Sequence, residues 1–284
     1  MPDPIIDIHQ HTNYANRSDV ELLRHQRHMG VTQTILLPAG TEVIRPSTHM
    51  GKSNGLAAKI TGNDAACLFA ANHPIEYFFF ANEVPDLPNA RQEIEKCLHR
   101  GALGIGEQKF GVDCDSQWMQ GIFDIAQDYQ VPVLMHIQHD MYNTNFLRFE
   151  SMLKKYPRVN FIGHAQTFWA NIDANHTDQT ILYPKTPVKA GGFTDRILSD
   201  YPNMFGDLSA GSGLNSLQRD TDHAHDFLER HQDKLMFGSD CDDRTGFTPL
   251  CSGADAIIMI KRLSATKEIE RKLLYENAKK MFRI

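Results

Sequence analysis

Short apolar runs alternate with stretches of helical periodicity along most of the chain. Eight of the runs are rich in β-branched and aromatic residues and have the length of strands: residues 5–8, 33–39, 77–83, 102–107, 131–137, 159–165, 204–210 and 234–240. Strands that alternate with helices pair in parallel around a common core, and eight such units suit a closed barrel. The pattern therefore predicts an α/β fold, a (β/α)8 TIM barrel, as a single domain over residues 1–284.

Amphipathic segments between these runs predict the outer helices. Residues 19–30 carry apolar side chains at helical spacing and end in Gly30, a typical helix C-cap. The same pattern recurs at 89–101, 116–129, 145–157, 195–202 and 222–232, and residues 252–282 supply the last helices, including a C-terminal helix against the barrel. Two longer segments, 40–55 and 166–192, are expected as loops of the catalytic face, because the loops after the strands form that face.

Composition narrows the class of protein. Hydrophobic residues make up 41% of the 284 and charged residues 23%, enough for a sizeable core without disulfides. A net charge of −6 offers no basic face for nucleic acid, which is excluded as an expected partner. The five cysteines are odd in number and include no CxxC pair, which favours reduced thiols and a cytoplasmic location. We expect no membrane association, because neither a spanning apolar stretch nor a signal-peptide pattern is evident.

Two histidines follow the first apolar run in "IIDIHQHT". His9 and His11 stand at positions i and i+2, so strand alternation sends both side chains to the same side, while Gln10 points away. An HxH pair alone is weak evidence for a metal, since core or solvated histidines are commoner. Its meaning depends on what the other strands present at the same level.

Four further strands end in a histidine or a carboxylate: Glu107, His136, His164 and Asp240. Each alone has an ordinary explanation as a helix cap, a core histidine or a turn aspartate. Together with His9 and His11 they predict one metal centre, because imidazole nitrogens and carboxylate oxygens suit a divalent ion, most simply Zn²⁺, with Mn²⁺ as the alternative. The absence of cysteine from this set argues against a closed structural site, so we expect an open, catalytic one.

The sequence resembles the amidohydrolase superfamily, specifically its amidohydrolase-related branch of metal-dependent barrel hydrolases. The resemblance covers nearly the whole chain and rests on "DIHQHT", "GIGEQKFG", "LMHIQ", "FIGHAQ", "MFGSD" and "ENAKKMF". It implies that His9 and His11 bind the more buried metal and that His136 and His164 serve a second metal or the substrate. It also implies that Asp240 is a ligand and the proton shuttle, with His164 beside it in catalysis, and that the chain forms a homodimer.

The fourth strand varies within the superfamily. Some members carry a carboxylated lysine there that bridges two metals, whereas TatD-like deoxyribonucleases and some lactonases use glutamate. This chain offers Glu107 and, two positions later, Lys109, on the same side of the strand. We expect Glu107 to bind metal and Lys109 to pair with an anionic group of the substrate.

Further residues near the strand ends are candidates for substrate contacts. Gln138 shares a strand face with His136, and the others follow strands five, six and eight: His139, Trp169, Asp242 and Arg244. Tyr183 and Arg219 are weaker candidates for a pocket wall or an anion clamp. Asp207 on strand seven is a candidate to orient a ligand histidine.

The predicted activity is hydrolysis of an ester, lactone or amide bond in a small polar or carboxylated molecule. A bound divalent ion lowers the pKa of water to about 7, and Asp240 is the expected acceptor of its proton. The first alternative is a non-oxidative decarboxylase or hydratase of the same branch, although decarboxylases tend to show "GSDYP" where this chain has "GSDCDD". A TatD-like phosphodiesterase and a barrel that binds without catalysis are the remaining alternatives.

Overall fold

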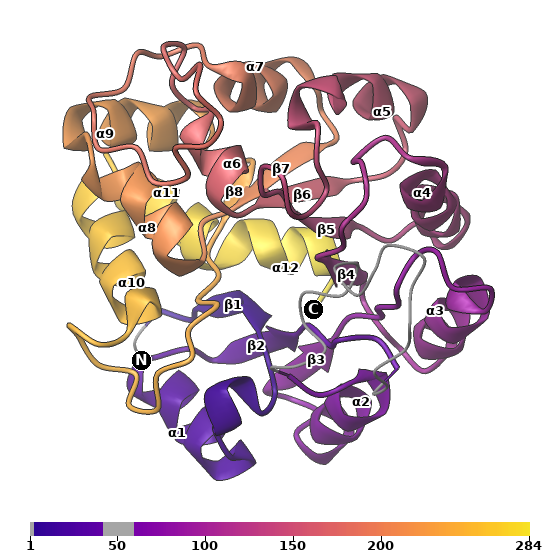
Figure 1. The fold of residues 1–284 in the computed structure, drawn as a ribbon. Coiled ribbons are helices and arrows are strands. Elements are labelled where there is room, and N and C mark those ends of the chain that lie inside the picture. The colour runs from indigo at the N-terminus through magenta and orange to yellow at the C-terminus, as the bar shows by residue number, and fades with distance from the viewer. Residues whose placement is uncertain (1–2, 42–59) are drawn as a thin grey trace.

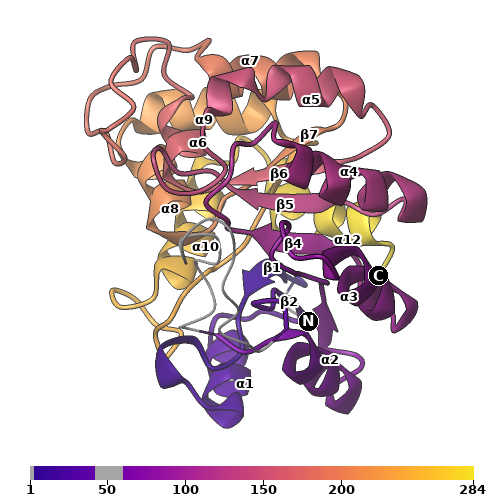
Figure 2. The ribbon, with the colours of Figure 1, turned by 45° about the vertical axis from the view of Figure 1, so that its right-hand side comes forward.

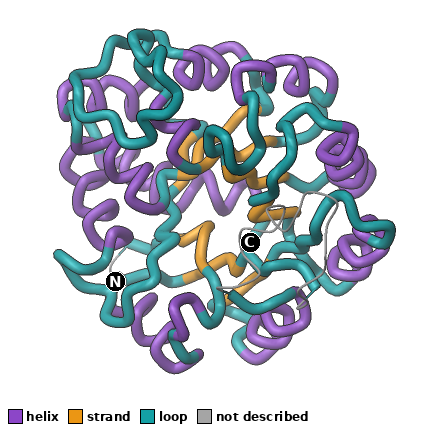
Figure 3. Tube along the Cα trace, viewed as in Figure 1, coloured by secondary structure: helices purple, strands orange, loops and turns teal. Residues whose placement is uncertain are grey.

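Eight parallel strands form the centre of the molecule. The structure is a computed structural model that describes residues 3–41 and 60–284, so most of the expected loop at 40–55 lies outside the described residues. All eight predicted strands are confirmed, most of them shorter than expected: β1 Ile6–Gln10, β2 Gln33–Leu36, β3 Tyr77–Phe79, β4 Ile105–Gln108, β5 Val133–His136, β6 Phe161–His164, β7 Met204–Asp207 and β8 Leu235–Met236. Figures 1 and 3 show them as an inner ring with the helices outside.

Backbone hydrogen bonds join two parallel series of strands, β1 to β3 and β4 to β8, into one ring. At one junction Ala81, just after β3, bridges to Ile105 of β4, and the Gly106 N–H donates to the Ala81 carbonyl at 2.8 Å. At the other junction the Ile8 N–H donates to the carbonyl of Phe237, just after β8, at 3.1 Å. The predicted barrel architecture is therefore confirmed.

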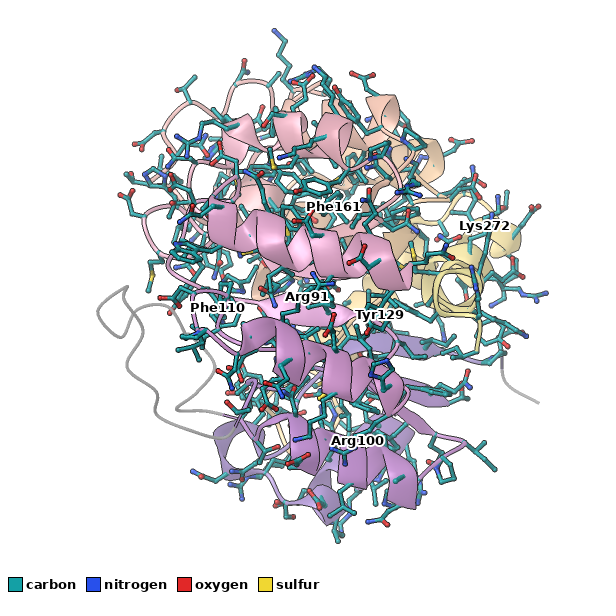
Figure 4. The ribbon with its side chains drawn as sticks, turned by 90° about the vertical axis from the view of Figure 1, so that its right-hand side faces the viewer. Arg91, Arg100, Phe110, Tyr129, Phe161 and Lys272 are labelled. Carbon is teal, nitrogen blue, oxygen red and sulfur yellow. The ribbon has the colours of Figure 1, made fainter. Side chains whose placement is uncertain are left out.

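The helices form the outer layer. They are α1 Asp19–His28, α2 Asn63–Asn72, α3 Ala90–His99, α4 Gln117–Tyr129, α5 Glu150–Lys155, α6 Gln166–Ala170, α7 Phe193–Asp200, α8 Ala210–Gln218, α9 Thr221–Arg230, α10 Ser252–Leu263, α11 Lys267–Arg271 and α12 Asn277–Phe282, with short turns η1 Tyr14–Asn16, η2 Phe146–Arg148 and η3 Lys272–Glu276. Gly30 follows α1 with a φ of 81°, as a C-cap requires. Side-chain hydrogen bonds link neighbouring helices at the surface. For example, Arg91 of α3, labelled in Figure 4, donates to Asp128 of α4 at 2.6 Å.

Three helices in the described part of the chain were not predicted. The α2 segment follows the loop after β2, and α6 begins the segment 166–192 that was expected as loop. The third, α8, starts at Ala210, so the predicted strand 204–210 ends at Asp207 instead. Gly213 packs within this helix, where a Cβ would lie 2.3 Å from the Leu208 backbone.

The core has two layers. Apolar side chains of the strands fill the barrel interior, and a larger cluster lies between the strands and the outer helices. The predicted C-terminal helix is confirmed: α12 lies across one end of the barrel (Figure 2), where Ala278 and Phe282 join the interior cluster and the Phe282 ring packs 5.6 Å from that of Phe80. This end is therefore closed by apolar side chains, and the polar candidate ligands lie at the opposite end.

Register slips between paired strands direct the side chains of candidate ligands toward that polar end. The register of β1 against β2 slips by one residue between Asp7 and Gln10, as at a β-bulge. Ile8 therefore still belongs to the interior cluster, while His9 directly after it reaches the carboxylates above. A second slip between β4 and β5, at 105–108, flanks Glu107.

Candidate metal centre

The six predicted metal ligands lie together above the interior core. The Nε2 atoms of His9 and His11 lie 3.5 Å and 3.6 Å from Glu107 Oε2. These three ligand atoms lie within 4.8 Å of one another, as the sites of one ion would. Strand alternation was thus the right guide for the HxH pair, and Gln10 points the other way, donating to Ser239 Oγ at 2.9 Å.

Asp240, after β8, faces the same point from beside His9, whose carbonyl accepts the Asp240 N–H at 2.8 Å. Its Oδ1 lies 3.3 Å from His11 Nε2 and 3.7 Å from His9 Nε2, and its Oδ2 lies 3.6 Å from His164 Nε2. The Asp240 side chain is 10% exposed, whereas that of Glu107 is 1% exposed. Asp240 is therefore the carboxylate of the centre that solvent and substrate can reach.

His136 and His164 complete the group on the far side of Glu107. His136 Nδ1 lies 2.5 Å from Glu107 Oε1, and His164 Nε2 lies 3.8 Å from the same oxygen. The ligand atoms of these three residues again lie within 4.8 Å of one another. These three residues would be available to a second ion.

Supporting residues fix the orientation of the histidine rings. The Nδ1 of His9 hydrogen-bonds to Asp207 Oδ2 at 2.6 Å, and that of His11 to the Leu37 carbonyl at 2.7 Å. The Nδ1 of His164 lies 2.9 Å from Ser209 Oγ. Such contacts hold each ring through Nδ1 and turn its Nε2 toward the centre.

The donor set fits a divalent cation. His9 Nε2 and Glu107 Oε2 are buried and have no hydrogen-bond partner among the described residues, which would be costly unless a cation is held there. Burial raises the pKa of the Asp240 carboxyl, but His9 and hydrogen bonds from His11 and His164 hold it well below its usual range. The pKa of Glu107 is likewise held low against burial by Lys109, His136 and His9. Both carboxylates are therefore ionised.

Cationic and aromatic groups border the centre. Burial would lower the pKa of Lys109, but Glu107 and Asp240 raise it, so this side chain is a stable cation beside the carboxylates. The Lys109 ammonium lies 5.8 Å from the centre of the Tyr142 ring, which in turn packs edge-on against His136 at 5.5 Å. Burial and Lys109 lower the pKa of His136 to about 4, so its imidazole is neutral at neutral pH.

A cavity of about 360 Å³ adjoins the centre after β5. Gln138 and His139, both predicted to contact substrate, line it together with Arg148 and Thr167. Gln138 Oε1 also lies 3.1 Å from His136 Nε2, so this side chain connects the cavity to the centre.

Two predicted substrate residues are placed elsewhere. Trp169 is buried in α6, and its Nε1–H donates to the Asp207 carbonyl at 3.0 Å, so it belongs to the core rather than to a pocket wall. Arg244 lies at the surface, where it pairs with Glu21 of α1 at 3.3 Å. Asp242 is exposed on the loop after β8, and its contact with substrate stays a prediction. The weaker candidate Tyr183 is 44% exposed, and its hydroxyl accepts a hydrogen bond from Gln166.

Sequence reasoning missed several residues of the site. Tyr14 packs its ring edge-on against His11 at 5.2 Å, and the charge of Asp240 and burial raise the pKa of its phenol. Tyr142 and Ser209 were not singled out either. The only available signal was their position shortly after a strand end, which many neutral residues share.

Fold and site together define a barrel with a histidine and carboxylate centre suited to a divalent metal. The profile of the family described as "Amidohydrolase" matches residues 6–284. The chain therefore belongs to the amidohydrolase family, whose members are metal-dependent enzymes that include hydrolases and decarboxylases.

Solved structures share the fold at low sequence identity. A 2,6-dihydroxybenzoate decarboxylase from Rhizobium is 15% identical, with 99% of each chain covered and a TM-score of 0.60. A 5-carboxyvanillate decarboxylase from Sphingomonas paucimobilis is 16% identical over 94% of this chain and 84% of that one, at a TM-score of 0.60. A probable 2-pyrone-4,6-dicarboxylic acid hydrolase from Acinetobacter baumannii is 15% identical, with 99% of each chain covered and a TM-score of 0.62.

No curated protein matches the chain. Among the described residues, no helix combines the length and the apolar character needed to cross a bilayer.

Proposed function

We propose that this chain hydrolyses an ester, lactone or amide bond of a small carboxylated molecule with the help of a zinc ion. The observation that carries the proposal is the position of Asp240, the accessible carboxylate between His11 and His164. A general base must reach both the attacking water and the leaving group, and Asp240 has an oxygen on each side of the centre. Manganese is the alternative ion, because the donor set is the same.

The remaining residues take roles that follow from their contacts. His9, His11 and Glu107 would hold the ion, with His136 and His164 available to a second one. When bound, such an ion polarises a carbonyl group and lowers the pKa of water to about 7. Asp240 takes the proton of the attacking water and returns it to the leaving group, and His164 keeps Asp240 Oδ2 in place at 3.6 Å.

Lys109 supports a carboxylated substrate. Its ammonium lies near two ionised carboxylates, Glu107 and Asp240, whose charge an ion at the centre would largely neutralise. In the loaded enzyme Lys109 is then free to pair with an anionic group. Gln138 and His139 add polar contacts on the cavity side.

Non-oxidative decarboxylation is the second candidate. Two of the similar structures are decarboxylases of hydroxylated aromatic acids, and a third is described as a probable pyrone dicarboxylate hydrolase. Both reactions use a carboxylated ligand beside a divalent ion, which the Lys109 position accommodates. The amidohydrolase match favours these two activities over the TatD-like phosphodiesterase and the non-catalytic barrel. Assembly as a homodimer and a cytoplasmic location stay predictions from the sequence.

The experiment that separates the candidates is a panel of lactones, esters, amides and hydroxybenzoates with the zinc-loaded protein. Acid release in a pH-stat, amine release in a colorimetric amine assay and carbon dioxide release are measured on the same samples. We expect acid release from a carboxylated lactone or ester, or amine release from a carboxylated amide, without carbon dioxide. Carbon dioxide from an aromatic acid, with no hydrolysis of the other compounds, would establish the second candidate instead.

Asp240→Asn tests the proton carrier. The amide keeps the size of the side chain but cannot accept a proton, so we expect kcat to fall by about 10²-fold or more, with most of the bound metal retained. Turnover and metal content are measured on the same preparation. Asp222→Asn, exposed on α9, is the control and should leave both unchanged. Normal turnover by Asp240→Asn would refute the assigned role.

A further inference from the structure

A second group of ligand-type side chains lies outside the barrel centre. It consists of His25 from α1, Cys241 and Asp243 from the loop after β8, and Cys251, the residue before α10. One ligand atom from each lies within 4.8 Å of all the others. His25, Cys241 and Cys251 are buried, and the Asp243 side chain is 9% exposed. Figure 1 shows how the loop before α10 passes beside α1.

The spacing of the four atoms suits a tetrahedral ion. His25 Nε2 lies 3.3 Å from Cys251 Sγ and 3.2 Å from Asp243 Oδ2, and Cys241 Sγ lies 4.0 Å from Asp243 Oδ2. With zinc–ligand bonds of about 2.0–2.3 Å, neighbouring ligand atoms of a tetrahedron stand about 3.3–3.8 Å apart. The observed separations are close to these values, so only small side-chain movements would be needed.

Local structure already orients two of the ligands. The Ala254 N–H donates to Cys251 Sγ at 3.4 Å, and a helix N-terminus of this kind favours a thiolate. Asp243 Oδ1 accepts hydrogen bonds from the Thr245 N–H and hydroxyl, and Oδ2 accepts one from the Gly246 N–H at 2.9 Å. This turn packs tightly on α1, because a Cβ at Gly246 would lie 2.4 Å from the His25 carbonyl.

A cation beside the cluster balances its charge. Two thiolates and one carboxylate carry three negative charges, and a divalent ion would leave one. The buried Arg17 donates to the carbonyls of Cys241 and Asp243 at 2.9 Å and 2.8 Å, so its guanidinium supplies the remaining positive charge. A neutral assembly is what a buried ion site requires.

We propose that His25, Cys241, Asp243 and Cys251 form a second metal site, a structural one for zinc or a similar thiophilic divalent ion. Four protein ligands leave no open position, which distinguishes it from the centre in the barrel. Binding would release the thiol protons to solvent and fix the loop that carries Asp240 to α1 and α10. The proposal does not depend on which reaction the barrel centre performs.

Cobalt replacement in the full-length protein tests the site, because a thiolate–cobalt charge-transfer band can come from it and not from the sulfur-free barrel centre. We expect this near-ultraviolet band in the wild-type protein and in His9→Asn, which alters the barrel centre. Cys241→Ser and Cys251→Ser should lose the band and about one ion per chain. Cys97→Ser, a buried cysteine of α3, is the matched control and should keep both.

A second measurement on the folded wild-type protein avoids variants that fail to fold. Titration with an organomercurial should release zinc to a chromophoric chelator as Cys241 and Cys251 are modified. Release of zinc in step with these thiols supports the site. The proposal is overturned if the wild-type protein shows no charge-transfer band, if mercurial titration releases no zinc, or if mass spectrometry finds a Cys241–Cys251 disulfide instead.

Discussion

The chemistry of the centre depends on residues that hydrogen-bond to the Nδ1 atoms of its histidines. Asp207 Oδ2 accepts a hydrogen bond from His9 Nδ1 at 2.6 Å and another from the Ser209 hydroxyl at 2.9 Å. The Ser209 oxygen in turn hydrogen-bonds to His164 Nδ1. One carboxylate therefore orients two of the candidate ligands. Contacts of this kind set the ring orientation and the basicity of a ligand nitrogen.

Asp207→Asn should weaken metal binding at the barrel centre. The amide cannot accept the Nδ1–H of His9 as strongly and can present a donor to it instead. We expect metal affinity to fall by about 10–100-fold in competition with a chelator. Asp222→Asn, exposed on α9, is the control. Equal affinity in the wild type and Asp207→Asn would show that the contact does not matter for binding.

Lys109→Met tests the proposed anion contact. Removal of the ammonium should raise KM for a carboxylated substrate by about 10–100-fold, the worth of a charged hydrogen bond, and should have a smaller effect on an uncharged analogue. Steady-state kinetics on the two compounds measure the difference. Lys185→Met, an exposed lysine of the 166–192 segment, is the control. The same KM change for both compounds would contradict an anion contact.

The sequence predicted the direction of side chains on strands better than that of side chains on loops. His9 and His11 face one point because a strand alternates regularly, even with the slip at Asp7 and Gln10. Arg244 and Trp169 were predicted from distance along a loop, which does not report direction. Arg244 pairs with Glu21, and Trp169 is buried in the core.

Among the elements, α7 and α9 are joined by a buried charge cluster. Asp195 of α7 lies 2.6 Å from His231 Nε2 and 3.1 Å from Arg230, at the end of α9. Burial would raise the pKa of the Asp195 carboxyl, but hydrogen bonds from His231, the Gly191 N–H and Arg230 lower it to about 2. The carboxylate form is thus favoured by the folded state.

Asp195→Asn should therefore lower stability in a pH-dependent manner. A depressed pKa stabilises the folded state above the unfolded pKa of about 3.9 and loses this effect as the pH falls toward 2. The free energy of unfolding should drop by about 2 kcal/mol at pH 7, with a smaller difference from wild type below pH 4. Denaturant unfolding across pH measures this, with the exposed Asp200→Asn as control. A difference independent of pH would contradict the charge argument.

The helices that were missed had weak signals. The α2 sequence "NDAACLFAAN" has little amphipathic contrast, and its N-cap is Gly62. The α6 helix has five residues, too few for a period to show, and α8 contains two glycines. Tertiary packing, rather than local preference, accounts for these elements.

In the whole molecule, one end of the barrel is packed and the other is reactive. The α12 helix covers the apolar end with Ala278 and Phe282, while the candidate ligands lie at the strand ends opposite. Stability and chemistry are thus separated along the barrel axis, as is usual in this architecture.

Phe282→Ala should destabilise the fold without emptying the metal centre. Loss of a buried phenylalanine leaves a cavity and lowers the free energy of unfolding by about 3–5 kcal/mol. Thermal or denaturant unfolding measures the loss, and metal content is compared on folded samples. Lys280→Ala, exposed on the same helix, should be near neutral. Loss of metal from folded Phe282→Ala would show that the two ends are coupled.

Anomalous diffraction from crystals of the zinc-loaded protein would locate the ion at the barrel centre. We expect an anomalous peak at the barrel centre within bonding distance of His9 Nε2 and His11 Nε2, with a Glu107 oxygen turned toward it. A barrel centre without a peak, or a peak there from which Glu107 points away, would contradict the assignment.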